Sequence, residues 1–283
     1  MRIGSTFVAA VAVTLAVPVR LVAQEPAGNP AQDAQPAAPD WSVNVGAMVF
    51  TYPRYPGSDE YRVVPFPLVN VSYRDRVYLG PSSTGIGFAL GAYPMYGSRV
   101  RIAVEFGGQD SRPADRADAL AGMEDRDMVA TGGVSLSYRA GAFEGIVAVS
   151  QGVNDDAGLI QTTRLVYTRP LGRVLLSAAA GAALANGRQM RREFGVTDAE
   201  AGRRQSLIDA GDGRLGPGDG HAYTPDGGLR HLGLGVSLIY PVAPRWSLVG
   251  LAGMEWLADE AAKSPLVRRR EQFAGGVGVG YRF

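Results

Sequence analysis

The two histidines are the side chains best suited to proton transfer in this sequence, and neither has a reactive partner at a useful spacing. His221 lies in the polar stretch "GDGHAY", and His231 lies in the alternating stretch "RHLGLGVSLIY". Ser237 follows His231 at a distance of about 20 Å along an extended strand, which is too far for the hydrogen bond that activates a serine nucleophile. We therefore assign no catalytic residue and predict that the chain is not an enzyme. A partner for His231 on a neighbouring strand stays open.

The motifs also give no sign of cofactor chemistry. The run "GDGRLGPGDG" at 211–220 lacks the nonapeptide repeat of calcium-binding β-rolls. The run "GLGVSL" at 233–238 lies inside a strand pattern rather than at a strand-to-helix turn, so it does not indicate a nucleotide site. The histidines show no metal-ligand spacing, and a formal net charge of +1 provides no field that would attract nucleic acid. We predict no cofactor, no metal and no nucleic-acid partner.

The elements that carry these residues are short segments of alternating apolar and polar residues, which predict β-strands. In the segment 245–256, a tryptophan stands near each end of the apolar face, as in strands that cross both interfaces of a membrane. The last residues, "FAGGVGVGYRF", place aromatic and valine side chains on one face and mostly glycine on the other. A soluble sheet explains any one strand equally well, but repetition over many strands favours a membrane-spanning barrel.

The first 40 residues predict export from the cytoplasm. Arg2 precedes an apolar run that ends near Ala23, so we interpret residues 1–23 as a signal peptide. Residues 24–40 are rich in proline, alanine and glutamine, which is typical of a linker, here in the periplasm. From residue 41 on, no apolar stretch is long enough to hold the chain in a bilayer as a helix, and cysteine is absent. A closed barrel over residues 41–283 is then the remaining way to span a membrane.

The connections between the expected strands are alternately short and long. Outer-membrane barrels place short turns in the periplasm and long loops outside the cell. The alternation holds if the segment 77–91 is divided at Pro81-Ser82-Ser83, which gives twelve antiparallel strands; ten strands is the alternative. We expect the glycine-rich part of the largest loop, 211–228, to be flexible. The short links are expected at 74–75, 92–97, 140–141, 169–171 and 241–244, and the long ones at 52–61, 107–127, 152–158, about 185–228 and 257–270.

Several motifs resemble those of the MipA/OmpV family, the MltA-interacting outer-membrane proteins. The stretch "YPRYPGSDEYRVVPFPLVNVSY" at 52–73 is similar to the family's N-terminal motif, in which Tyr-x-Gly-Ser precedes a Pro-x-Pro strand. The resemblance continues through "GMEDRDMVATGGVSLSY", "FGVTDAEA" and "AAKSPLVRRREQ", and so spans nearly all of the chain after the linker. The residues that carry the family motif are Tyr55, Gly57, Ser58, Pro65, Pro67, Ser264 and Pro265.

We interpret these motif residues mainly as architecture. Gly57 supplies a positive φ and Ser58 bonds nearby amides, as turn residues do at a strand end. Pro65 and Pro67 present their missing N–H groups on one side of a strand. We therefore expect that strand to begin irregularly, near the rim of the barrel.

The resemblance implies a protein of the Gram-negative outer membrane that brings a lytic transglycosylase and a murein synthase together. Two other functions stay open: a pore for small solutes, and an adhesin that acts through the long loops. Membrane lipid, lipopolysaccharide and the outer-membrane assembly machinery are the other expected partners. Tyr281 and Phe283 are the expected assembly signal. Arg268, Arg269 and Arg270 are candidate contacts to lipopolysaccharide phosphates.

Overall fold

The structure is a computed structural model that describes residues 40–74, 76–82, 86–92, 99–153 and 157–283. The predicted signal peptide and all but the last residue of the predicted linker lie outside the described residues and stay predictions. Within the described part of the chain, no helix has the length and the apolar character needed to cross a bilayer.

Twelve antiparallel strands close into one barrel, in which each strand pairs with its neighbours in sequence and β1 pairs with β12. The predicted twelve-strand barrel is confirmed, and the ten-strand alternative is wrong. The division of 77–91 is confirmed as well, because β3 ends at Pro81 and β4 begins at Ile86. The strands are β1 (Trp41–Pro53), β2 (Tyr61–Tyr73), β3 (Val77–Pro81), β4 (Ile86–Ala92), β5 (Val100–Gln109), β6 (Val129–Ala140), β7 (Phe143–Gly152), β8 (Leu159–Leu171), β9 (Val174–Ala185), β10 (Gly228–Ala243), β11 (Trp246–Leu257) and β12 (Glu271–Arg282).

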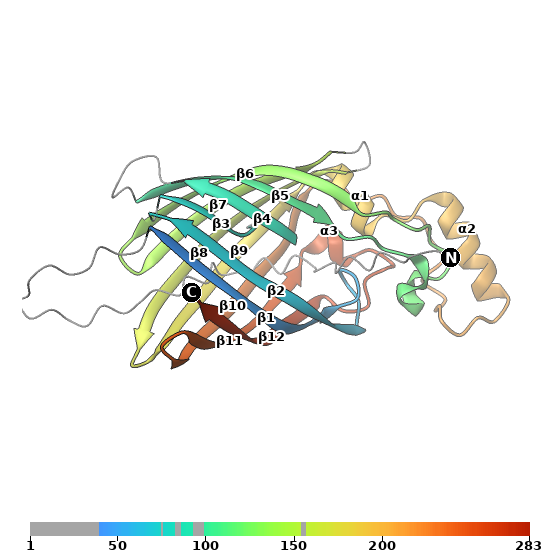
Figure 1. Cartoon of the computed structure of the whole chain (residues 1–283). Helices are drawn as coiled ribbons and strands as arrows, with labels where there is room; N and C mark the ends of the chain where they lie inside the picture. The colour runs from blue at the N-terminus through green and yellow to red at the C-terminus, as the bar shows by residue number, and fades with distance from the viewer. Residues whose placement is uncertain (1–39, 75, 83–85, 93–98, 154–156) are drawn as a thin grey trace, which may run out of the picture.

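Short and long connections gather at opposite ends of the barrel (Figure 1). Two of the short turns are tighter than expected, because β8 runs on through Leu171 and β10 runs on through Ala243. The first of these turns contains Gly172, whose φ of +58° suits a glycine. The long connections carry all the helices, which are η1 (Ala114–Arg116), η2 (Asp118–Leu120), α1 (Gly187–Phe194), α2 (Asp198–Asp209) and α3 (Asp259–Ala262).

The two faces of each strand have the polarity expected of a barrel in a membrane. On β10, Leu234 is 51% exposed on the outer face, whereas Ser237 is buried on the inner face. The inner faces of β5–β9 carry small and polar side chains together with paired charges. Glu144, for example, accepts bonds from Arg101 at 3.3 Å and from Arg139 at 2.5 Å. The exposed apolar band faces lipid, and the interior is filled by side chains that would be costly in lipid.

The strand that contains Pro65 and Pro67 is more regular than expected. β2 pairs with β1 without interruption from Pro53↔Tyr61 to Trp41↔Tyr73, and both prolines lie in the middle of this ladder. With β3, however, the described residues of β2 pair only from Val71 to Tyr73. At the two prolines, one edge of β2 is paired with β1, and the described residues on its other edge are not paired with β3. An edge that lacks a partner tolerates the missing donors, which explains why the prediction of an irregular strand start was wrong.

The outward position of Leu234 gives a first testable prediction. Leu234→Arg should lower the free energy of unfolding in lipid vesicles by about 2–4 kcal/mol, because it places a charge near the bilayer midplane. Val242→Arg is the matched control on the outer face of the same strand, close to the short-turn end, and should cost about 0–1 kcal/mol. Urea titrations of tryptophan fluorescence measure both values. Equal costs at the two positions would contradict the assigned depth of the strand.

Candidate functional site at the capped end of the barrel

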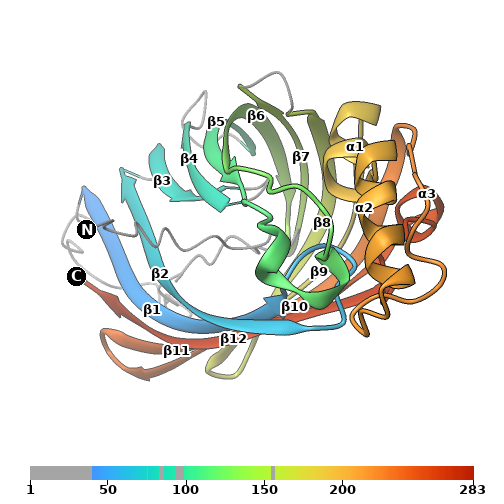
Figure 2. The same cartoon turned by 90° about the vertical axis from the view of Figure 1, so that its right-hand side faces the viewer.

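The long connections pack together into a cap, which we define as segments 54–60, 110–128, 186–227 and 258–270. Figure 2 looks at this end and shows α1, α2 and the segment 110–128 in front of the strands. One apolar cluster draws on all four segments, since it contains Tyr55, Leu120, Ala201 and Leu266. A second cluster, which includes Phe194, Leu257 and Ala261, joins α1 and α3 to the end of β11. The cap therefore has a core of its own.

Arg204 on α2 is the polar centre of the cap. Its side chain is completely buried. Its Nη1 donates to the carbonyls of Ala119 at 2.8 Å and Ala121 at 3.0 Å, and its Nε donates to the carbonyl of Asp219 at 2.7 Å. One guanidinium thus holds the segment 110–128 and the glycine-rich segment to α2. Burial lowers the pKa of Arg204 from its ordinary value, although the nearby Asp219 carboxylate opposes that shift.

The glycine-rich segment 211–228 is held by a second arginine. Nη1 and Nη2 of Arg268 donate to the two oxygens of the Asp219 carboxylate, at 2.7 and 2.6 Å, in the bidentate geometry that suits a guanidinium. Burial acts to raise the pKa of Asp219, but the bonds from Arg268 and from the Gly216 amide outweigh it and hold that pKa below its ordinary value. We expected this segment to be flexible; instead, the buried Asp219 attaches it to the end of the last long connection.

The start of α2 fixes a further contact within the cap. Thr197 and Glu200 form a capping box, in which the Thr197 hydroxyl accepts from the Glu200 amide and the Glu200 carboxylate accepts from the Thr197 amide. The same carboxylate also accepts from the Glu124 amide at 3.1 Å and from Arg126 at 3.3 Å. Burial acts to raise the pKa of Glu200, but these bonds hold it below its ordinary value. Glu200 therefore caps the start of α2 and also binds segment 110–128.

The structure brings together two groups of motif residues that are far apart in the sequence. The Tyr55 hydroxyl donates to the carbonyl of Leu266 at 2.8 Å. The Gly57 carbonyl accepts from the amides of Arg268 and Arg269 at 2.8 and 3.0 Å. The loop between β1 and β2 therefore binds directly to the connection between β11 and β12. Burial raises the pKa of Tyr55, which keeps its hydroxyl protonated as a donor.

The remaining motif residues of the cap also make internal contacts. Ser58 is buried and bonds within its own turn, where its hydroxyl lies 3.1 Å from both the amide and the carbonyl of Glu60. The Ser264 hydroxyl donates to the carbonyl of Phe194 at 2.6 Å, which attaches the last long connection to the end of α1. Pro265 is buried beside it. Ser58 and Ser264 thus bond within the cap, and the interpretation of the motif as architecture stays a prediction.

A polar network lies where the cap meets the inner wall of the barrel. Arg230 of β10 donates to the Glu193 carboxylate of α1 at 2.5 Å and lies 2.6 Å from Nδ1 of His231. His231 is 1% exposed, and its Nε2 lies 3.6 Å from the Glu255 carboxylate of β11. The partner of His231 on the next strand is therefore a carboxylate and not a serine. His221 lies in the exposed loop, with Nδ1 2.7 Å from the carbonyl of Gly218.

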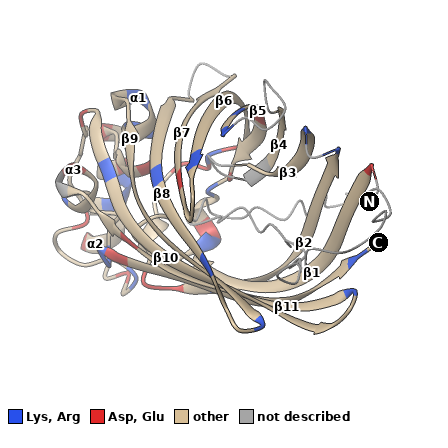
Figure 3. Cartoon of the chain, turned by 90° about the vertical axis from the view of Figure 1, so that its left-hand side faces the viewer, with Lys and Arg blue, Asp and Glu red and all other residues tan. Residues whose placement is uncertain are grey.

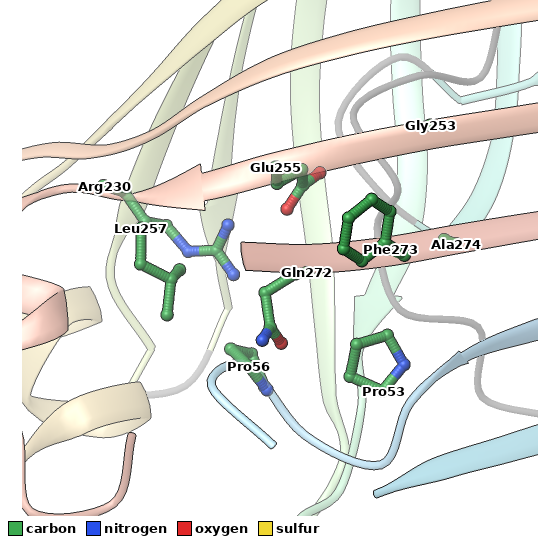
Figure 4. A pocket seen from close by; sticks show the side chains of 9 residues that line it. All are labelled: Pro53, Pro56, Arg230, Gly253, Glu255, Leu257, Gln272, Phe273 and Ala274. Atoms are coloured by element: carbon green, nitrogen blue, oxygen red, sulfur yellow. The ribbon is translucent and has the colours of Figure 1, made fainter. Parts of the chain in front are cut away.

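A small cavity adjoins this network (Figure 4). Arg230, Glu255 and Gln272 line it, with the Gln272 amide turned towards Pro56, and Pro53 lies on the same side as Pro56. Its volume of about 20 Å³ has room for one water molecule but not for an organic substrate. Within the described ranges, no cluster of three or more histidine and acidic side chains could hold a metal ion. The polar groups around the cavity therefore link β10, β11 and β12 to α1 and to the first loop.

The predicted contacts to lipopolysaccharide and to the assembly machinery stay predictions. The Arg268 side chain is neutralised by Asp219, and Arg270 Nε donates to the carbonyl of Leu257 at 2.6 Å, so both arginines already serve the cap. Arg269 is exposed. In the final strand, the Tyr281 ring contacts those of Trp246 and Phe283 at centroid distances of 4.9 Å.

The sequence analysis did not identify the residues that organise the cap, although one of them had a recognisable signal. The stretch "TDAE" has the Ser/Thr-x-x-Glu spacing of a capping box, and this signal could have located the start of α2. Arg204 and Asp219 carried no comparable signal, because their partners lie in other connections and depend on the closed barrel.

Comparisons with known proteins identify the family. A family model described as "MltA-interacting protein MipA" matches residues 45–283. Two solved structures are similar to this chain at low identity. An outer membrane channel from Pseudomonas putida F1 is 12% identical, covering 89% of this chain and 100% of that one, with a TM-score of 0.38. The anion-selective porin from Comamonas acidovorans is 10% identical, covering 86% and 98%, with a TM-score of 0.37.

A third structure, the N-terminal β-barrel domain of Pseudomonas aeruginosa OprF, is 11% identical, covering 66% of this chain and 98% of that one, with a TM-score of 0.27. TM-scores below 0.5 carry no inference about function. No curated protein sequence matches the chain.

The buried position of Arg204 gives a second prediction. Arg204→Met should lower the free energy of local opening of the cap by about 3 kcal/mol, because it leaves buried carbonyls and the Asp219 region without their donor. Arg203→Met is the adjacent control, since Arg203 is exposed and reaches the same segment only at its surface, where it bonds to the Gly122 carbonyl at 3.0 Å and forms an ion pair with Glu124 worth about 0–1 kcal/mol. Native-state hydrogen exchange of residues 111–124 measures both. Equal loss of protection would refute the role of Arg204.

Gly57 gives a third prediction, which separates backbone strain from steric contact. Gly57 has a φ of +96°, and an added Cβ would lie 2.6 Å from Cγ2 of Val267. Gly211 has a φ of +79°, with open space around its position. Alanine at either site should lower the free energy of unfolding by about 1–2 kcal/mol, because its side chain disfavours a left-handed backbone. Only Gly57→Ala should also push the loop between β1 and β2 away from the connection between β11 and β12. Protection of the cap amides from hydrogen exchange should therefore fall further in Gly57→Ala than in Gly211→Ala, and equal effects would contradict the close contact.

Proposed function

Because the chain belongs to the family of the MltA-interacting protein MipA, whose model covers residues 45–283, we propose that it is a scaffold that binds a lytic transglycosylase of the MltA class. The chain is an outer-membrane β-barrel, and the scaffold acts at its periplasmic end. A murein synthase is the second enzyme that it brings to the same place. The family match is the observation that carries this proposal.

The geometry of the barrel supports a role without catalysis. His231 is buried beside charged partners, the cavity next to it holds only one water, and the described residues include no metal-binding cluster. The polar side chains of the cap bond to one another and to backbone groups of the cap. We infer that the protein holds partners and does not transform a substrate.

The position of the linker suggests how a barrel with short turns binds a partner. A stable interface usually buries about 800 Å² on each partner, which is more than a few two-residue turns present. Asp40, the last residue of the predicted linker, lies at the short-turn end, where its carboxylate binds Arg74 at 2.9 Å. The last residue of the linker therefore lies on the same side of the barrel as the short turns. We propose that it orders on the partner, at a cost in entropy that keeps the complex reversible.

Deletion of residues 24–40 tests this proposal. The deletion should reduce the recovery of a purified MltA-class transglycosylase on beads that carry the barrel in detergent, without changing the heat-modifiable mobility of the barrel. A linker of the same length and composition but shuffled order is the matched control for tethering alone. Full recovery with the deleted chain would assign binding to the turns. Absence of any recovery with the intact chain would overturn the scaffold proposal.

A pore for small solutes is the second candidate, favoured by the charged inner wall at Arg101, Glu105 and Glu144. The cap segments that lie across one end in Figure 2 argue against free passage. Planar-bilayer recordings separate the two candidates. Single-channel steps from the intact chain, together with no transglycosylase binding, would favour the pore.

A further inference from the structure

Aromatic side chains form a belt around the outside of the barrel at its short-turn end. Trp41 contacts Tyr73 at a centroid distance of 4.7 Å, and Phe143 contacts Tyr167 at 5.0 Å. Trp246 contacts Tyr281 at 4.9 Å. Trp41, Phe143 and Trp246 are each about half exposed. Such belts lie at the level of the lipid head groups, so these residues mark the depth of the periplasmic interface.

Arginines are attached to this belt through the aromatic rings themselves. The guanidinium of Arg74 lies 5.2 Å from the centroid of Tyr73, and that of Arg173 lies 5.8 Å from the centroid of Tyr240. Arg245 donates to the Tyr281 hydroxyl at 3.2 Å. These contacts place the charges beside the apolar band, at the depth of the head groups.

The charge at this end is strongly one-sided among the described residues. Of its acidic side chains, Asp40 is exposed but bound by Arg74, and Glu144 is buried with Arg101 and Arg139. Figure 3 faces this end and shows the blue of arginine at the tips of several strands, with little red. The exposed basic side chains are Arg74, Arg76, Arg99, Arg169, Arg173 and Arg245.

We call the six exposed arginines at this end the arginine belt. We propose that the arginine belt binds the phosphate groups of anionic phospholipids in the periplasmic leaflet of the outer membrane. A guanidinium offers two parallel donors that match phosphate oxygens, and an aromatic neighbour at the interface fixes its depth. An acidic protein is the other ligand that such charge attracts. The lipid is favoured because Arg74, Arg173 and Arg245 contact rings on the outside of the barrel, at the edge of the exposed apolar band.

The test measures how much phosphatidylglycerol and how much phosphatidylcholine the full mature protein and its variants retain. The mixed micelles contain the two lipids in equal amounts. Native mass spectrometry counts the bound lipids of each type. The parent should retain phosphatidylglycerol in preference, and Arg173→Gln with Arg245→Gln should reduce that preference by about fivefold per arginine. The matched control is Arg188→Gln with Arg191→Gln on α1, which removes the same charge at the other end and should keep the preference.

The other possible results also support or overturn lipid binding by these arginines. Heat-modifiable mobility reports whether the double variant folds, and Arg173→Gln alone replaces it if the double variant does not. Equal lipid preference in the parent and the belt variant would overturn the proposal, as would an equal fall in the α1 control. Binding of poly-L-glutamate that depends on Arg173 and Arg245, without any preference for phosphatidylglycerol, would assign the belt to an acidic protein instead.

Discussion

The need to pair backbone groups inside a bilayer is the constraint on which the rest of this structure depends. An unpaired N–H or C=O in hydrocarbon costs several kcal/mol, so a sheet in lipid must close on itself. Here β1 pairs with β12 from Asn44↔Arg282 to Thr51↔Gly275, and the shortest ladder of the ring is that of β2 with β3, where the described residues pair only from Val71 to Tyr73. Glycines in β12 allow the close approach, since a Cβ at Gly276 or Gly278 would meet the backbone of β1 within 2.7 Å. Once the ring is closed, every connection must lie at one end or the other.

The two ends then use their charges in opposite ways. At the capped end, arginines are turned inward, where Arg204 and Arg268 bind carbonyls and the carboxylate of Asp219. At the short-turn end, Arg74 and Arg173 lie against aromatic rings on the outside of the barrel, while Arg101 and Arg139 pair with the buried Glu144. The same residue type therefore organises loops at one end and faces the membrane at the other. This difference follows from the length of the connections, because a two-residue turn cannot fold back to bury a guanidinium.

The barrel was largely predictable from sequence because its signals are local. A lipid-facing side chain such as Leu234 and a lumen-facing one such as Ser237 differ in polarity at every second position, so alternation reports the strand directly. The turns after Leu171 and Ala243 were placed too early, because proline at positions 170 and 241 suggested that the strands had ended. The cap was not predictable in the same way. Asp219 meets Arg268 across 49 residues, and the glycine-rich composition around it indicated flexibility.

The contact between the two groups of motif residues has a consequence for the order of assembly. Tyr55 and Leu266 are separated by 211 positions, and Gly57 and Gln272 by 215. Contacts of such separation form only after the chain ends have met, and topologies rich in them fold slowly. The loop between β1 and β2 cannot bind the connection between β11 and β12 until β1 has paired with β12. The contacts of Tyr55 and Gly57 are therefore present only when the ring has closed. In a barrel that is still open between β1 and β12, the segments 54–60 and 258–270 of the cap would not be in contact. These loops would then be accessible to a protease that the closed protein excludes.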